Sequence, residues 1–109
     1  MIKELEDRLV NLSQRINKLC NGLDRSFISE HLTKQIIRSS TSAALNYGEA
    51  QGAESKADFI HKVSIILKEL RETQISLKLL TDSVKEKENK KFFFITLLIK
   101  FIIYLTQYQ

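Results

Sequence analysis

A heptad-like row of apolar residues opens the chain and constrains its fold more than any other feature. The row recurs at alternating steps of three and four residues: Ile2, Leu5, Leu9, Leu12, Ile16, Leu19 and Leu23. This spacing places all of them on one face of an amphipathic helix, which has to pack against other helices. Asn21-Gly22 then predicts the end of this helix, with Gly22 in the left-handed conformation.

The rest of the chain also favours helices. The absence of Pro and the presence of only three Gly in 109 residues remove most signals for strands and tight turns. Ser29 is the predicted N-cap of a second helix that runs towards Gly48, and Ser55 with Asp58 resembles a capping box that opens a third helix ending near Thr81. With an apolar helix at about 90–107, the prediction is an all-α, antiparallel up-and-down four-helix bundle in one domain, 1–109.

A row of polar residues distinguishes the second helix. Arg38, Ser42, Asn46 and Glu49 follow one another at steps of four, four and three, so they share one face. The small residues beside them, Ser39, Ser40, Ala43 and Ala44, favour a close helix crossing. In a hairpin of the second and third helices, Arg38 lies near Glu69 or Glu72. We predict a semi-buried polar seam that consists of Arg38, Ser42, Asn46, Glu49, Glu69 and Glu72. A plain solvated face is the alternative.

The net charge of +4 is carried by the second half of the chain. Its densest part contains Lys85, Lys87, Lys90 and Lys91, which alternate in part with glutamates. This cluster could form a basic rim that contacts RNA or DNA, or it could be a solvated connection between helices.

The predicted fourth helix is apolar on nearly its whole circumference. Between Phe92 and Leu105 only Thr96 and Lys100 are polar, and they lie four residues apart. We therefore expect an outer face that contacts a second copy of the chain, formed by Phe93, Phe94, Leu97, Ile99 and Tyr104. As a helix the run covers only about 21 Å of a hydrocarbon core of about 30 Å, so a membrane span is not expected.

Motifs for catalysis or metal binding are weak. Asp58 and His61 have the carboxylate-x-x-His spacing of di-iron bundles, but such sites need two copies of that element. The chain has no G-x-S-x-G elbow and no phosphate-binding Gly loop, and its single cysteine, Cys20, is expected to be a structural residue. The sequence predicts a non-enzymatic protein without metal or cofactor. The reduced thiol and an N-terminus unlike a signal peptide favour the cytoplasm.

Residues 35–80 resemble a known family, the four-helix-bundle proteins encoded in intervening sequences of bacterial 23S ribosomal RNA genes. The matching positions are Gln35, Arg38, Ser42, Asn46, Glu49, Ser55, Lys56, Asp58, Phe59, Ile60, Lys68, Glu69, Glu72, Thr73, Leu79 and Leu80. The apolar C-terminal segment departs from the charged fourth helix of the pattern. A lineage-specific tail and an altered reading frame would each explain that departure.

The resemblance implies a small bundle that assembles as a homo-oligomer and has no established enzymatic activity. Similar folds serve as accessory proteins of diversity-generating retroelements, where a basic oligomer engages nucleic acid; that link is an analogy of fold. Two functions stay open: a self-associating bundle that binds RNA or DNA through a basic rim, and a structural or protein-interaction module with no nucleic-acid role.

Overall fold

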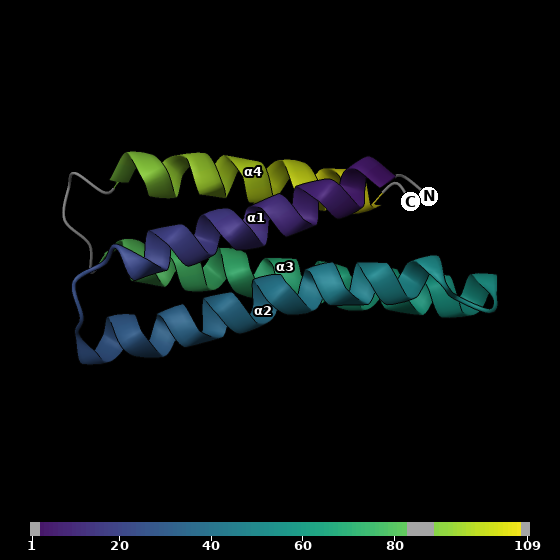
Figure 1. The fold of residues 1–109 in the computed structure, drawn as a ribbon, viewed down its shortest axis with the longest axis horizontal. Helices are drawn as coiled ribbons and strands as arrows, with labels where there is room; N and C mark the ends of the chain where they lie inside the picture. Colours follow the sequence, from purple (N-terminus) through teal and green to yellow (C-terminus); the bar gives the residue numbers. More distant parts are fainter. Residues whose placement is uncertain (1–2, 83–88, 108–109) are drawn as a thin grey trace.

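The computed structural model describes residues 3–82 and 89–107, which form four α-helices (Figure 1). Helix α1 spans Lys3–Asn21, α2 spans Phe27–Gln51, α3 spans Lys56–Thr81 and α4 spans Asn89–Gln107. These two ranges contain no strand. The predicted all-α class is therefore confirmed.

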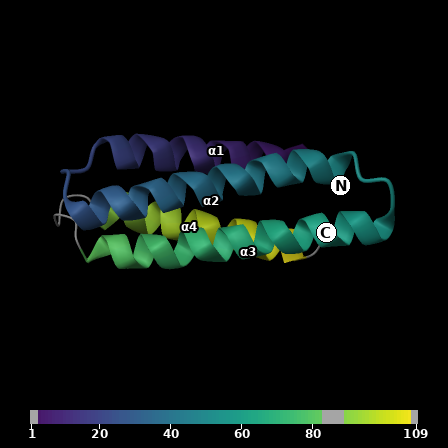
Figure 2. The same cartoon turned by 90° about the horizontal axis from the view of Figure 1, so that it is seen from below.

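Successive helices run in opposite directions, so both ends of the described chain lie at one end of the bundle (Figure 1; Figure 2). Helix α1 packs against α2 and α4, and α3 packs against the same two helices. The molecule measures 45 × 22 × 18 Å. Helices α2 and α3 have 25 and 26 residues, against 19 in α1 and in α4. The α2/α3 hairpin therefore projects beyond the start of α1 and the end of α4 (Figure 1).

The core is built from one apolar row on each helix. In α1 the residues of the heptad row from Leu5 to Leu19 are at most 5 % exposed. The facing rows are Leu32, Ile36, Ala43 and Tyr47 in α2, Ile66, Leu70, Leu77 and Leu80 in α3, and Phe92, Ile95, Ile99 and Ile102 in α4. Each fully buried large aliphatic side chain contributes about 1.5–3 kcal/mol of transfer free energy, so these rows supply the main driving force for folding.

The N-cap of α3 is the predicted residue, whereas the N-cap of α2 differs from the prediction. Ser55 caps α3, because its Oγ accepts a hydrogen bond from the Asp58 N–H at 3.0 Å. In α2 the N-cap is Ser26 and not Ser29. The two serines form a reciprocal capping box in which each Oγ accepts from the other's backbone N–H at 3.1 Å. Ser29 is thus the N3 residue of this capping box.

The end of α1 also differs from the prediction. No described residue, Gly22 included, has a positive φ. The Gly22 N–H donates to the Leu19 carbonyl at 3.2 Å and the Leu23 N–H donates to the Cys20 carbonyl at 3.3 Å. These i→i+3 bonds satisfy terminal carbonyls of the helix without a left-handed glycine.

Candidate nucleic-acid interface

A basic groove lies between α1 and α4, where α1 ends and α4 begins. Its volume is about 360 Å³, and we call it the α1/α4 groove. Its walls are formed by Arg15, Lys18 and Leu19 from α1 and by Lys91, Phe94 and Ile95 from α4. Three cationic side chains thus lie beside apolar ones, and no Asp or Glu is among the described residues that line the groove.

The local sequence explains why this region is positive. In α1, Arg15 and Lys18 stand three residues apart and share a face, and no acidic residue occurs between Asp7 and Asp24. The Arg15 Nε donates to the Asn11 Oδ1 at 2.8 Å, a neutral partner that leaves the charge uncompensated. In α4 the whole range 89–107 contains no Asp or Glu.

The first turn of α4 adds to this positive field. It contains Lys90 and Lys91 and no acidic residue. The N-terminus of a helix carries a partial positive charge, so cations placed there cost about 0.3–1 kcal/mol each. A bound anion would offset this repulsion.

The predicted basic rim is only partly within the described residues. Lys90 and Lys91 are both exposed at the start of α4, and Lys91 lines the groove. Lys85 and Lys87 lie outside the described residues. The sequence interpretation missed Arg15 and Lys18, although the acid-free interval between Asp7 and Asp24 was a signal for them.

Phe94 places an aromatic ring beside these cations. The side chain is 64 % exposed and lines the groove. The neighbouring Phe93 ring lies 6.2 Å away, centroid to centroid, with an interplanar angle of 67°. Because this contact is edge-to-face, the two rings do not stack on each other.

The outer face of α4 is apolar, as expected, but two of the residues that form it differ from the prediction. Phe93, Phe94, Leu97 and Tyr104 are exposed. Ile99 is completely buried, so its predicted place in an oligomer contact is wrong: with Phe92, Ile95 and Ile102 it belongs to the core row at steps of three and four. Phe101 is exposed instead, with the Arg8 guanidinium carbon 4.8 Å from its ring centroid.

The predicted polar seam joins α2 to α3 at two places. The Arg38 Nη1 lies 3.3 Å from the Glu69 Oε2, and its Nη2 lies 2.5 Å from the Glu72 Oε1. The expected pairing across the helices is therefore present with both carboxylates. The hydrogen bond to Glu72 is the main cause that raises the pKa of Arg38. Further along, Lys62 donates to Glu49 at 2.8 Å.

The seam is more exposed than predicted. The Arg38 side chain is 54 % exposed, and Glu49 is also exposed. Ser42 and Asn46 are half-buried and bond to each other within α2, where the Asn46 Nδ2 donates to the Ser42 carbonyl at 2.8 Å and to its Oγ at 3.1 Å. Glu69 is buried and Glu72 is half-buried, so the seam combines buried, half-buried and exposed residues.

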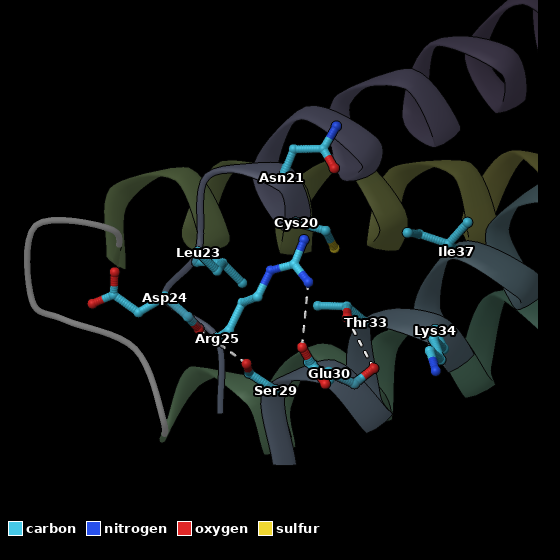
Figure 3. A pocket seen from close by; sticks show the side chains of 10 residues that line it. All are labelled: Cys20, Asn21, Leu23, Asp24, Arg25, Ser29, Glu30, Thr33, Lys34 and Ile37. Carbon is cyan, nitrogen blue, oxygen red and sulfur yellow. Dashed lines mark hydrogen bonds and ion pairs between the residues drawn. The ribbon is translucent and has the colours of Figure 1, made fainter. Parts of the chain in front are cut away.

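A second pocket, of about 320 Å³, lies at the turn between α1 and α2 (Figure 3). Arg25 extends across it to Glu30, with 3.5 Å between nitrogen and oxygen, and the Ser29 Oγ donates to the Asp24 carbonyl at 3.1 Å. Burial raises the pKa of Cys20 to about 11. The thiol is thus protonated near neutral pH, and the Arg25 cation is already paired with a carboxylate, so this pocket lacks an activated nucleophile.

The described part of the chain offers neither a metal cluster nor a membrane span. Within residues 3–82 and 89–107, no three His, Cys, Asp or Glu side chains are grouped closely enough to hold a metal ion. None of the described helices is both long enough and apolar enough to cross a membrane.

Comparisons with known proteins give the chain a family. The sequence model of the 23S rRNA-intervening sequence protein family matches residues 4–96, a wider range than the stretch 35–80. A crystal structure of a protein of unknown function from the S23 ribosomal protein family of Bacteroides thetaiotaomicron is 33 % identical. The alignment covers 94 % of each chain with a TM-score of 0.78. No curated protein matches significantly. The chain therefore belongs to the 23S rRNA-intervening sequence protein family.

Proposed function

We propose that this protein is a non-catalytic helical-bundle module that self-associates and binds RNA or DNA at the α1/α4 groove. The observation that supports the nucleic-acid role is that Arg15, Lys18 and Lys91 line one groove. The part of the groove lining that the structure describes contains no carboxylate. Phosphate neutralisation by such cations supplies essentially all of the affinity in sequence-independent binding. A reducing cytoplasmic compartment suits the single Cys20 thiol.

Charge placement supports this assignment over a plain solvated surface. Ordinary solvated helix faces mix cations with acids, as the Arg38–Glu72 and Lys62–Glu49 pairs do on the α2/α3 side. Among residues 3–82 and 89–107, the groove is lined by three cations and by apolar side chains, and a polyanion is the partner that such a surface attracts. The polar side chains given for the groove lining are all Arg or Lys, which bind phosphates of any sequence, so binding is expected with little sequence preference.

Fluorescence anisotropy with labelled RNA and DNA strands tests the nucleic-acid role. If the three cations neutralise three phosphates, raising the salt concentration from about 50 to 200 mM should weaken single-strand binding about 20-fold. The double variant Arg15→Gln/Lys18→Gln should bind more weakly and show a shallower salt dependence, because each lost phosphate contact lowers the slope by about 0.7.

The matched control removes the same two charges elsewhere. Lys68 and Arg71 are exposed on α3 and do not line the groove. Lys68→Gln/Arg71→Gln lowers the net charge equally and should leave most of the affinity in place. Equal losses in both double variants would show that net charge, and not the groove, attracts nucleic acid. No retention of wild-type protein at low salt would contradict the nucleic-acid role and favour a structural or protein-interaction module.

A separate observation supports self-association: the outer face of α4 is apolar and exposed. Large side chains at steps of four, four and three cover the centre of this face: Phe93, Leu97, Phe101 and Tyr104. Soluble monomers rarely expose a contiguous apolar patch larger than a few hundred Å². A second copy of the chain would cover it and would place two α1/α4 grooves in one assembly, which raises the avidity for a long polyanion.

A further inference from the structure

We infer that the α1/α4 groove binds single-stranded nucleic acid in preference to duplex, with a base stacked on Phe94 while Arg15, Lys18 and Lys91 hold the adjacent phosphates. The inference rests on the proposed nucleic-acid role and specifies the form of the ligand. Its basis is the position of a largely exposed aromatic ring in the wall of a cationic groove. That pairing of a backbone-tracking groove with a stacking ring is how proteins hold single strands without reading sequence.

The placement of Phe94 fits a stacking role better than a packing role. Its helix neighbour Ile95 turns into the core, whereas Phe94 keeps 64 % of its surface exposed. Phe93 meets it edge-to-face and does not cover it as a stacked ring would. The exposed ring lies in the wall of a cationic groove, where a base is a flat partner that can cover it.

The groove dimensions agree with one segment of a single strand. Its volume of about 360 Å³ is close to the lower end of the range for pockets that take small organic ligands, about 300–1,000 Å³. Bases in a duplex are stacked on one another, so their faces are not available to Phe94. Charge alone would favour the duplex, because its phosphates are more closely spaced along the axis. A preference for single strands is therefore the signature of stacking.

Base stacking on Phe94 can be observed directly because the chain contains no tryptophan. In the variant Phe94→Trp the indole becomes a unique fluorescent reporter that can itself stack on a base. Titration with single-stranded DNA or RNA should quench this fluorescence to saturation. A strand of the same length made of abasic sugar-phosphate units carries the same charge and should bind without quenching. A duplex of equal length should bind more weakly than the single strand.

Phe27 supplies the control, since it is 92 % exposed at the start of α2, outside the groove and outside the apolar face of α4. Phe27→Trp should show little quenching with the same strands. Phe94→Ala should lower the affinity for base-bearing strands by about 5- to 150-fold, the usual effect of one lost base–aromatic contact, and leave the affinity for the abasic strand unchanged. Both positions are exposed, so far-ultraviolet circular dichroism should confirm that the variants fold.

The outcomes separate this inference from the proposed function. Salt-dependent binding that does not distinguish base-bearing from abasic strands would overturn base stacking and leave the phosphate-binding role intact. A duplex preference or equal quenching at positions 27 and 94 would also overturn it. Absence of any binding would contradict both. A response of Phe94→Trp to vesicles of anionic phosphatidylglycerol, with none to oligonucleotides, would show that the groove meets a lipid surface and would overturn the inference as well.

Discussion

The Oγ of Ser39 lies 2.6 Å from the Oγ1 of Thr73, in a fully buried contact that joins α2 to α3. Each hydroxyl also has a backbone acceptor in its own helix: the Thr73 Oγ1 lies 2.9 Å from the Glu69 carbonyl, and the Ser39 Oγ lies 3.3 Å from the Ile36 carbonyl. Small side chains surround this point, because Ser40 and Ala43 are buried beside it. The small, polar stretch of α2 is therefore explained by a close, hydrogen-bonded crossing with α3.

Removing either hydroxyl should destabilise the bundle modestly. Thr73→Val keeps the side-chain shape and Ser39→Ala keeps the close approach, so each should lower the free energy of unfolding by about 1 kcal/mol. The double variant should lose less than the sum of the single losses, since no buried hydroxyl is left without its partner. Urea denaturation measures all four proteins.

Thr33→Val is the control for this cycle. The Thr33 hydroxyl donates to the Glu30 carbonyl of its own helix at 3.1 Å, in a solvent-exposed hydrogen bond. Its loss should change the free energy of unfolding by less than about 0.5 kcal/mol. Strictly additive losses at Ser39 and Thr73 would show that the hydrogen bond between them contributes nothing.

Replacing Arg38 should cost less than the loss of a buried charge. The sequence suggested a semi-buried seam, for which orphaning one partner costs about 3–5 kcal/mol. The Arg38 side chain is 54 % exposed, but its partner Glu69 is only 8 % exposed and would lose its cation. Arg38→Ala should therefore lower the free energy of unfolding by about 1–2 kcal/mol, between the values for exposed and fully buried pairs. The loss should shrink further at high salt, which screens exposed charges. A loss of about 3 kcal/mol in urea denaturation would restore the buried-seam interpretation.

Cys20 should react slowly in the folded protein. Burial raises its pKa from 9.0 to about 11, so at pH 8 the thiolate is about 100-fold scarcer than for an ordinary cysteine. The folded-state pKa is the higher one, so stability is unaffected below about pH 9 and falls between about pH 9 and 11 as the unfolded thiol ionises first. Alkylation by iodoacetamide with and without urea measures the first effect. Cys20→Ala should remove the contribution of this thiol to the loss of stability between about pH 9 and 11. Fast alkylation of the folded protein would contradict the burial of Cys20.

Periodicity predicted the helices and most of the core, because an amphipathic row shows which face of a helix is buried. Periodicity failed where the sequence does not show which residues of a helix form the buried row. In α4 nearly every residue is apolar, so the sequence did not separate buried Ile99 from exposed Phe101. The cap of α2 was misplaced by one turn because Ser26 and Ser29 both suit a cap and bond to each other.

The groove could not be predicted, because it depends on the register between two helices far apart in the chain. Arg15 and Lys18 meet Lys91 only after α4 returns along α1. Heptad spacing orients each helix about its own axis but does not set how far it slides along its neighbour. The same limit applies to Ser39 and Thr73: each hydroxyl was visible in the sequence, but their contact depends on the α2/α3 register.

The apolar outer face of α4 predicts that the protein is not a monomer in solution. Sedimentation velocity should give a mass above the 12.6 kDa of one chain at micromolar concentration. Leu97 lies at the centre of this face, between Phe93 and Phe101, so Leu97→Lys should shift the protein towards the monomer. A buried lysine without a carboxylate partner is too costly for an interface to accept.

Leu45→Lys on α2 is the matched control for the interface. Leu45 is 64 % exposed, more than Leu97, and α2 does not pack against α4 within the bundle. If α4 forms the contact, Leu45→Lys should sediment like the wild type, because its side chain stays in water in the oligomer. Dissociation by Leu45→Lys and not by Leu97→Lys would move the interface to α2. A wild-type monomer at micromolar concentration would refute self-association, since the face of α4 would then be tolerated in water.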